Sequence, residues 1–223
     1  SHTTYNKGFC SNCGAYQPAT DSNSDGTYEI GNAGQLFWFA AHVNSGNRSS
    51  KAVMTADIDL ENRPWTPIGL YKADPFIDLS YTGTFDGQKH IIKNLNVHVT
   101  DGREAGFFSR TRDASLSNFG IVNATIVSDP VNSNSYRAGV VGGELEACTV
   151  NNVYTCGNLS VTTEHEQKGG FAGECHSTTL YNCYTTHHTF TSTIGVTANN
   201  CFYLGNEENA SSAGTFMTAA QMA

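Results

Sequence analysis

A short glycine-containing motif returns three times at nearly constant spacing, and this repetition limits the folds open to the chain. "EAGFFS" at 104–109 recurs as "RAGVVG" at 137–142 and as "KGGFAG" at 168–173. Each copy is followed by a second echo, namely "LSNFGIVNATI" (116–126), "VNNVYTCGNLSV" (150–161) and "LYNCYTT" (180–186). A unit of about 30 residues made of short strands and turns cannot bury its own apolar face, so the copies must stack on one another.

The echoes share one pattern, in which apolar residues flank two polar residues and the second polar residue is Asn. "IKNLNVHV" from Ile92 fits as an earlier copy, and "ANNCFYL" (198–204) as a last, degenerate one. The pattern predicts that the apolar pairs stack at the interstrand spacing of roughly 4.8 Å; these pairs are Ile92/Leu95, Leu116/Phe119, Val150/Val153 and Leu180/Cys183. It also predicts a ladder of side-chain amides at turns, because Asn tolerates left-handed backbone; its members are Asn94, Asn118, Asn152, Asn182 and Asn200.

Composition supports a chain of many short strands joined by turns. Charged residues make up only 14% of the 223 residues, and 22 residues are Gly, which favours turns over helices. One amphipathic helix is expected at about 33–44, where Asn32 is a suitable N-cap and four apolar residues recur at helical spacing: Leu36, Phe39, Ala40 and Val43. The sequence therefore predicts an all-β protein, a short β-solenoid with a single substantial helix.

Net charge and hydropathy exclude two classes of partner. The formal net charge of −8 argues against a nucleic-acid binder, which needs Lys and Arg to replace counterions on phosphates. No apolar run approaches the roughly 18 residues needed to cross a bilayer, so no membrane insertion is expected.

The repeat motifs resemble the GLUG-motif repeat family, which is named for glycine-rich cores of the "AGFFS", "AGVVG" and "GGFAG" type. "YEIGNAGQLFWFAAHVNSG", "MTADIDLENRPWTPIG" and "GTFDGQKHIIKNLNV" resemble the segment that leads into such repeats, and "NCFYLGNEENASSAGTFMTAAQMA" resembles the tail that follows them. The resemblance implies a right-handed parallel β-helix capped at its N-terminus by the helix at 33–44. The expected organisation is an N-terminal segment (1–27), the capped repeat domain (28–205) and a C-terminal tail or linker (206–223).

What the resemblance implies about function is a non-catalytic module of a larger secreted or wall-attached bacterial protein. The family includes adhesin-like proteins and immunoglobulin-A-protease-like proteins, in which the repeat module is separate from any catalytic domain. The expected partners are a host glycan or glycoprotein and the other domains of the same polypeptide. Two alternatives stay open: an enzyme or accessory domain acting on polysaccharide or glycoprotein, and a plain spacer.

A C-x-x-C pair lies near the start of the chain, in "GFCSNCGAYQPA". Cys10 and Cys13 follow His2, and the set resembles a short zinc-knuckle element at the front of related surface proteins. A structural zinc ion takes four ligands, and only these three are local, so the fourth ligand is not identified. A disulfide and two thiols are the alternatives. A redox enzyme is not favoured, because no βαβ pattern surrounds the pair.

Four more cysteines of the repeats are candidates for a second metal site. Cys148, Cys156, Cys175 and Cys183 lie near several His residues, but Cys183 occupies an apolar slot of the repeat, so buried thiols are favoured over a metal site. The seven cysteines are an odd number, so they cannot all pair within one chain.

Asp57 and Asp59, with Asp86, are the best candidates for catalytic carboxylates. Asp57 and Asp59 are two residues apart in a strand and belong to the lead-in motif, so a role in turn and backbone hydrogen bonds is favoured for them over catalysis.

The stretch "LYKADPFIDLSY" reads as an insertion that bulges from the repeats. Loops on a rigid scaffold often carry binding residues. Tyr71, Phe76 and Tyr81 are therefore candidates to stack on a sugar ring, with Asp74 and Asp78 to bind its hydroxyls. The alternative is that these aromatic residues pack over the edge of the cap. Trp65, by contrast, is expected in the core under the cap.

Overall fold

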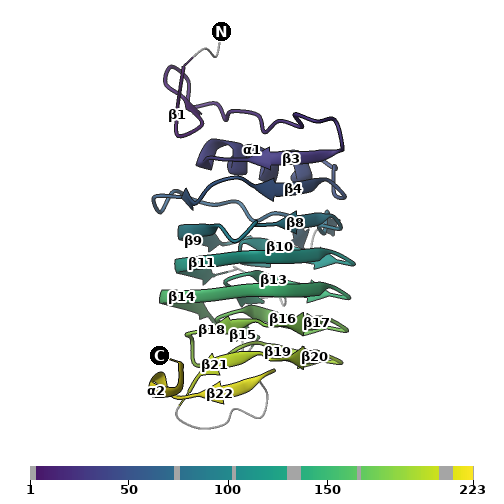
Figure 1. Cartoon of the computed structure of the whole chain (residues 1–223), viewed down its shortest axis with the longest axis vertical. Helices are drawn as coiled ribbons and strands as arrows, with labels where there is room; N and C mark the ends of the chain where they lie inside the picture. Colours follow the sequence, from purple (N-terminus) through teal and green to yellow (C-terminus); the bar gives the residue numbers. More distant parts are fainter. Residues whose placement is uncertain are drawn as a thin grey trace.

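The computed structural model describes residues 4–72, 76–101, 104–129, 137–164, 167–205 and 213–222. The protein is mostly β, and nearly all of its strand pairs are parallel. Strands from successive sequence repeats are stacked on one another, so the chain advances along the stack from the N-terminus, at the top of Figure 1, to the C-terminus near the bottom. In the described part of the chain, two segments are helical, α1 (Ala33–Asn44) and α2 (Ala219–Met222).

The largest sheet collects one or two strands from every repeat. Its central path, in spatial order, is β22 (Thr215–Met217), β21 (Phe202–Leu204), β18 (Tyr184–Thr185), β14 (Thr149–Thr163), β11 (Ser115–Ser128), β8 (Thr84–Asp86), β4 (Lys51–Met54) and β3 (Thr27–Ile30). Four strands join off this path: β5 (Ile58–Asp59), β9 (Ile91–Val99), β17 (Thr179–Tyr181) and β20 (Thr197–Asn199). All of these pairs are parallel, as stacked copies require.

The glycine-containing motifs lead into a second parallel sheet. It contains β10 (Phe108–Arg112), β13 (Gly142–Glu146), β16 (Ala172–His176) and β19 (Ser192–Ile194). Beside it, β12 (Ala138–Gly139) pairs with β15 (Lys168–Gly169), and a bridge joins Ala105 to Ala138. The three motif copies therefore lie on neighbouring strands, as their sequence spacing predicted.

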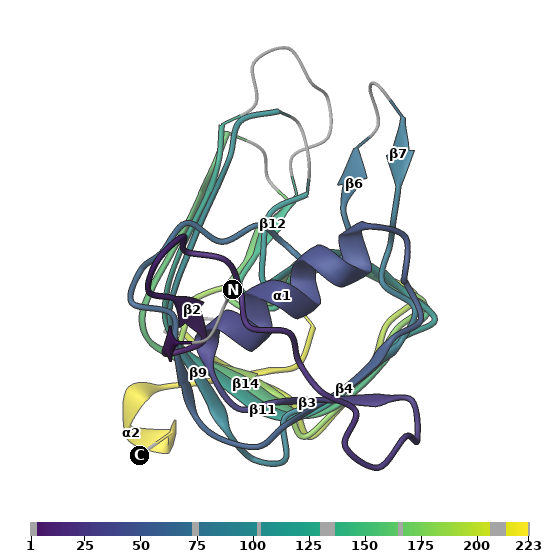
Figure 2. The same ribbon diagram turned by 90° about the horizontal axis from the view of Figure 1, so that it is seen from above.

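Two short antiparallel pairs stand apart from the stack. One is β1 (Tyr5–Asn6) with β2 (Phe9–Cys10), and the other is β6 (Tyr71–Lys72) with β7 (Ile77–Asp78). Figure 2 shows the β6–β7 hairpin projecting from the outline of the stack, as expected for an insertion.

The helix confirms its sequence prediction. Asn32 caps it, because its side chain accepts a hydrogen bond from the Gln35 backbone N–H at 2.9 Å. Its apolar face is buried through the four residues that the spacing indicated: Leu36, Phe39, Ala40 and Val43. Figure 2 shows α1 lying across the end of the stack, where it covers apolar side chains that have no further repeat above them.

The N-terminal segment packs onto this helix rather than extending freely from it. Gly34 in α1 allows the approach, since a Cβ there would clash with the Gly8 carbonyl, and the Gly34 N–H donates to the Lys7 carbonyl at 2.9 Å. The Phe9 ring contacts the Phe37 ring edge-on at 5.6 Å, and the Arg63 guanidinium lies 4.2 Å from the centre of the Phe9 ring. Segment 4–27 and the repeat domain therefore share one packed core.

The apolar stacking is confirmed for the central copies and corrected for the first. Leu116 pairs with Val150, and Val150 pairs with Leu180, all fully buried. Ile92, however, pairs with Ile121, and the partner of Leu116 on the preceding repeat is Phe85. The short pattern around Asn occurs twice within one repeat. The sequence prediction therefore aligned "IKNLNVHV" with the wrong part of the following repeat.

The Asn residues sit in left-handed backbone, with φ between 53° and 58° at the five predicted positions. Four of them form a ladder that begins at Asp86: its carboxylate accepts from the Asn118 amide at 3.0 Å, and Asn152, Asn182 and Asn200 follow, each donating to the one before. Asn94 belongs to a second ladder instead. Its amide donates to Asp59 at 2.8 Å, and it accepts from Asn123 at 3.5 Å.

Candidate functional site

The two N-terminal cysteines flank a tight turn: Cys10 ends β2, and Cys13 lies in the turn that follows it. Cys10 is 4% exposed, Cys13 is exposed, and the Gly14 N–H donates to the Cys10 carbonyl at 2.8 Å. His2 lies outside the described residues. Within those residues no cluster of three or more His, Cys, Asp or Glu side chains is arranged to hold a metal ion. The turn therefore supplies two thiols suited to zinc, and the zinc site stays a prediction.

Two of the three aromatic residues of the insertion lie together: the Tyr71 and Phe76 rings meet edge-on, with centroids 6.3 Å apart. Tyr71 and Phe76 are on the hairpin, and Phe76 is 72% exposed. Tyr81 is in the core: it has no exposed surface, stacks on Phe108 at 5.4 Å and donates its hydroxyl to the Ser50 carbonyl at 2.8 Å. The prediction of Tyr81 as an exposed binding residue is therefore wrong. Asp74 lies outside the described residues, and the role of Tyr71 and Phe76 stays a prediction.

Asp78, the other acid of the insertion, is bound within the protein. It accepts from the Ser80 hydroxyl at 2.6 Å and from Arg112 at 3.1 Å. Burial opposes ionisation of this carboxyl, but the Ser80 hydrogen bonds and the two neighbouring arginines, Arg112 and Arg48, hold its pKa below the ordinary value. Its hydrogen-bonding capacity is therefore largely used inside the fold.

A cluster of charged side chains lies on the second sheet, and sequence reasoning missed it. Arg137 is its centre: its guanidinium reaches Glu104 at 3.0 Å and Glu144 at 3.1 Å, and it also contacts Glu174. The three carboxylates are between 0% and 4% exposed. Burial raises the pKa of Glu144 although Arg137 and a second arginine favour its charged form.

A second arginine connects this cluster to the hairpin. Arg110 reaches Glu144 at 3.2 Å and Glu146 at 2.6 Å, and its guanidinium lies 4.3 Å from the centre of the Tyr71 ring. Arg110 pairs directly with Glu144 across the sheet, and Arg112 with Glu146. The sequence contained a signal for this cluster: Arg110 and Arg112 in one repeat occupy the positions that Glu144 and Glu146 occupy in the next. The carboxylates of this cluster contact guanidinium groups, so the arrangement resembles a buried ion-pair network more than a reactive acid pair.

The acidic pair of the lead-in motif is hydrogen-bonded to the next repeat and to its own turn. Asp57 accepts from the Ile91 N–H at 3.1 Å and contacts a His90 ring nitrogen at 3.1 Å. Asp59 accepts from the Asn94 amide and from the Glu61 N–H, both at 2.8 Å. These hydrogen bonds lower the pKa of both carboxyls. The geometry therefore agrees with the turn and backbone role that the sequence favoured for them.

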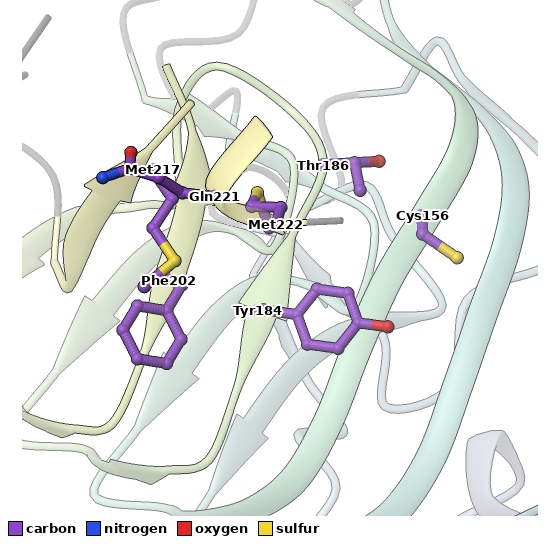
Figure 3. A pocket seen from close by; sticks show the side chains of 7 residues that line it. All are labelled: Cys156, Tyr184, Thr186, Phe202, Met217, Gln221 and Met222. Atoms are coloured by element: carbon purple, nitrogen blue, oxygen red, sulfur yellow. The ribbon is translucent and has the colours of Figure 1, made fainter. Parts of the chain in front are cut away.

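A pocket of about 360 Å³ opens near the C-terminal end of the large sheet. Its residues come from four separate strands and α2, and Figure 3 shows their side chains: Cys156, Tyr184, Thr186, Phe202, Met217, Gln221 and Met222. The volume lies at the small end of the range for small-molecule sites, and the lining is mostly apolar with a few polar groups, which is the usual make-up of such sites. The Thr186 hydroxyl is buried with no hydrogen-bond partner among the described residues.

One wall of the pocket is part of an aromatic stack. The Tyr154 and Tyr184 rings are parallel within 5°, with centroids 5.0 Å apart. Gly120 precedes Tyr154 in the ladder, and the Tyr154 ring lies over it, where a Cβ would clash. Because Tyr154 covers one face of Tyr184, the opposite face lies on the side of the next strand, which carries Phe202. The sequence signal for this site was the outward-facing aromatic residue in equivalent positions of successive repeats.

The remaining cysteines are mostly buried thiols, as predicted. Cys148, Cys175, Cys183 and Cys201 are each 2% exposed or less, while Cys156 is half-buried in the pocket wall. Desolvation raises the pKa of Cys175 to about 12 and also raises that of Cys148. The structure holds all five as thiols. The raised pKa values keep Cys148 and Cys175 protonated at neutral pH.

Comparison with known proteins finds a similarity in structure. The chain is similar in structure to a crystal structure from Bacteroides ovatus described as a "putative immunoglobulin A1 protease", with a TM-score of 0.56 and 18% sequence identity. The similarity covers 92% of this chain and 87% of that one. At this identity the likeness shows a shared fold alone. No family model matches the sequence, and neither does any curated protein.

Proposed function

We propose that the stacked repeats form a short right-handed parallel β-helix and that this β-helix is a non-catalytic binding module of a secreted or surface-attached bacterial protein. The parallel pairing of every repeat with the next and the Asn ladders support the β-helix. The described residues include no helix long and apolar enough to cross a bilayer. The bacterial neighbour in structure, whose description names a protease, shares the fold.

The ligand proposed is a ring of a host glycan or glycoprotein, bound in the C-terminal pocket. The observation that carries this is the Tyr184 ring, which Tyr154 supports from one side and which borders the pocket. The apolar C–H face of a sugar packs well on such a fixed aromatic face.

The test is an array of glycans and host glycoproteins probed with the purified chain. Tyr184→Ala should weaken binding about tenfold or more, since it removes an aromatic contact at the centre of the site. Tyr181→Ala is the matched control, because Tyr181 is 42% exposed on the same repeat but does not line the pocket. Equal binding by wild type and Tyr184→Ala would reject this site, and no binding by wild type would favour the spacer.

An enzyme acting on polysaccharide is the second candidate, and one observation favours it. Glu144 and Glu174 lie on adjacent strands, burial raises the pKa of Glu144, and Arg110 contacts both Glu144 and the Tyr71 ring. Analysis of the same array for released sugars or cleaved glycoprotein tests this candidate. Product that disappears in Glu144→Gln, with the fold retained, would establish the enzyme instead of the binding module.

A further inference from the structure

Two cysteines of successive repeats directly precede residues that wall the pocket. Tyr184 pairs with Phe202 across β18 and β21, so the residues before them, Cys183 and Cys201, are also neighbours. The backbone confirms this alignment, because the Phe202 N–H donates to the Cys183 carbonyl at 2.9 Å. Both thiols are buried, at 0% and 2% exposure.

From this placement we propose that Cys183 and Cys201 form a disulfide that links the last repeats and holds the two aromatic walls of the pocket at a fixed spacing. Adjacent strands are roughly 4.8 Å apart, which lies inside the Cα–Cα range of about 4.4–6.8 Å that a disulfide spans. The side chains already point the same way, since each thiol donates to the carbonyl two residues earlier, Cys183 to Tyr181 at 3.2 Å and Cys201 to Asn199 at 3.3 Å.

The two thiols perturb each other's ionisation. The neighbouring Cys183 lowers the pKa of Cys201, while Cys201 and burial raise the pKa of Cys183. This agrees with two side chains that lie next to each other. The thiolate is the attacking form in disulfide exchange.

The oxidant is a disulfide of low molecular mass, such as oxidised glutathione. The Cys201 thiolate attacks one glutathione sulfur and releases the other glutathione as a thiol after it takes up a proton. The Cys183 thiol then loses its proton, attacks the Cys201 sulfur and releases the second glutathione. Two protein thiols are oxidised and one glutathione disulfide is reduced to two thiols. Because both sulfurs are buried in the folded protein, the link forms while the last repeats assemble.

The test is refolding of the whole chain in reduced and in oxidised glutathione, followed by peptide mapping by mass spectrometry. We expect one linked peptide pair, Cys183 with Cys201, that has lost two hydrogens and reverts on reduction. Cys156→Ser is the matched control: it removes the half-buried pocket cysteine and should leave the link intact. Linkage of a different cysteine pair, or glutathione adducts without any link, would overturn the proposal.

A second measurement concerns stability and binding. Oxidised wild type should melt several degrees above reduced wild type, because the link constrains the unfolded chain, and Cys201→Ala should show no such difference. The effect on the pocket rests on the proposed function: oxidation should tighten glycan binding several-fold. A link without any glycan binding would reject the proposed function and leave the disulfide proposal intact. Glycan binding without a link would reject the disulfide and leave the proposed function intact.

Discussion

The Nη1 atom of Arg137 lies 3.0 Å from Oε1 of Glu104, a carboxylate with no exposed surface. The same guanidinium also contacts Glu144 and Glu174, from the two repeats that follow. One arginine therefore lies against three buried carboxylates from three different repeats, and Arg110 and His176 also approach this group. Removing a single partner of a buried ion pair is costly, because the remaining charges keep their desolvation penalty.

We therefore expect Arg137→Met to lower the free energy of unfolding by about 3 kcal/mol or more. Chemical denaturation monitored by circular dichroism measures this loss. The control is Arg63→Met, since Arg63 is 47% exposed and pairs with Glu61 at 3.4 Å, an interaction worth about 1 kcal/mol or less. Similar losses in the two variants would show that the cluster around Arg137 does not support the fold.

The Asn ladder gives a prediction that separates backbone strain from hydrogen bonding. Asn152 has a φ of 55°, donates to Asn118 at 3.0 Å and accepts from Asn182 at 3.2 Å. Asn152→Ala should cost about 2 kcal/mol, from roughly 1 kcal/mol of left-handed strain and about 1 kcal/mol for the loss of these two exposed hydrogen bonds. Asn152→Gly removes both hydrogen bonds without the strain, so it should be the milder change. Equal unfolding free energies for the two variants would contradict the importance of the backbone conformation.

Asp59 should make stability depend on pH in the acidic range. Hydrogen bonds from the Asn94 amide and the Glu61 N–H lower its pKa below the ordinary 3.8. Because the folded pKa is the lower one, the stabilisation is fully present above about pH 4 and is lost as the pH falls through the folded pKa. The difference in unfolding free energy between wild type and Asp59→Ala should therefore shrink on acidification from about pH 5 to about pH 2.

The readout for Asp59→Ala is denaturation at several pH values, together with glycan binding at neutral pH. The folded variant should keep binding, since Asp59 does not line the C-terminal pocket. A difference that stays constant with pH would contradict the role assigned to the carboxylate. Loss of an enzymatic activity in a folded variant would instead identify Asp59 as catalytic.

The cysteine turn predicts a metal content. Expression in zinc-replete medium should yield close to one zinc ion per chain, and Cys13→Ser should lose it, because a structural site needs all of its thiolate ligands. Cys156→Ser, far along the sequence in the wall of the pocket, should keep the metal. Elemental analysis of the purified variants provides the measurement. Wild type without zinc would leave a disulfide or two thiols as the state of Cys10 and Cys13.

Local patterns in the sequence were sufficient for several parts of this protein. The helix Ala33–Asn44 and its Asn32 cap follow from residues within four positions of each other. The left-handed turns follow from Asn itself, and parallel stacking follows from the repetition of a unit too short to bury its own core. The burial of Trp65 was also predicted correctly: it is 4% exposed and stacks on Phe107.

Other features required the register between repeats. Ile92 was matched with the wrong strand, because one local pattern occurs twice in each repeat. Tyr81 was expected on the surface, but the insertion returns to the core just before it, so its ring fills the space between Phe39 and Phe108. No local feature of the sequence marks the residue at which an insertion ends.

The amino-acid sequence by itself determined the repeating, parallel, mostly β arrangement and the helix at its end, because these depend on spacing and on intrinsic backbone preference. Only the tertiary structure decided which side chains meet across repeats. Three features depend on such meetings: the Arg137 cluster, the pocket bordered by Tyr184, and the adjacent thiols of Cys183 and Cys201. Each brings together residues from different repeats of the chain. A shift of one residue in register would turn each of these side chains to the opposite face of its sheet, and burial of the whole core is what fixes that register.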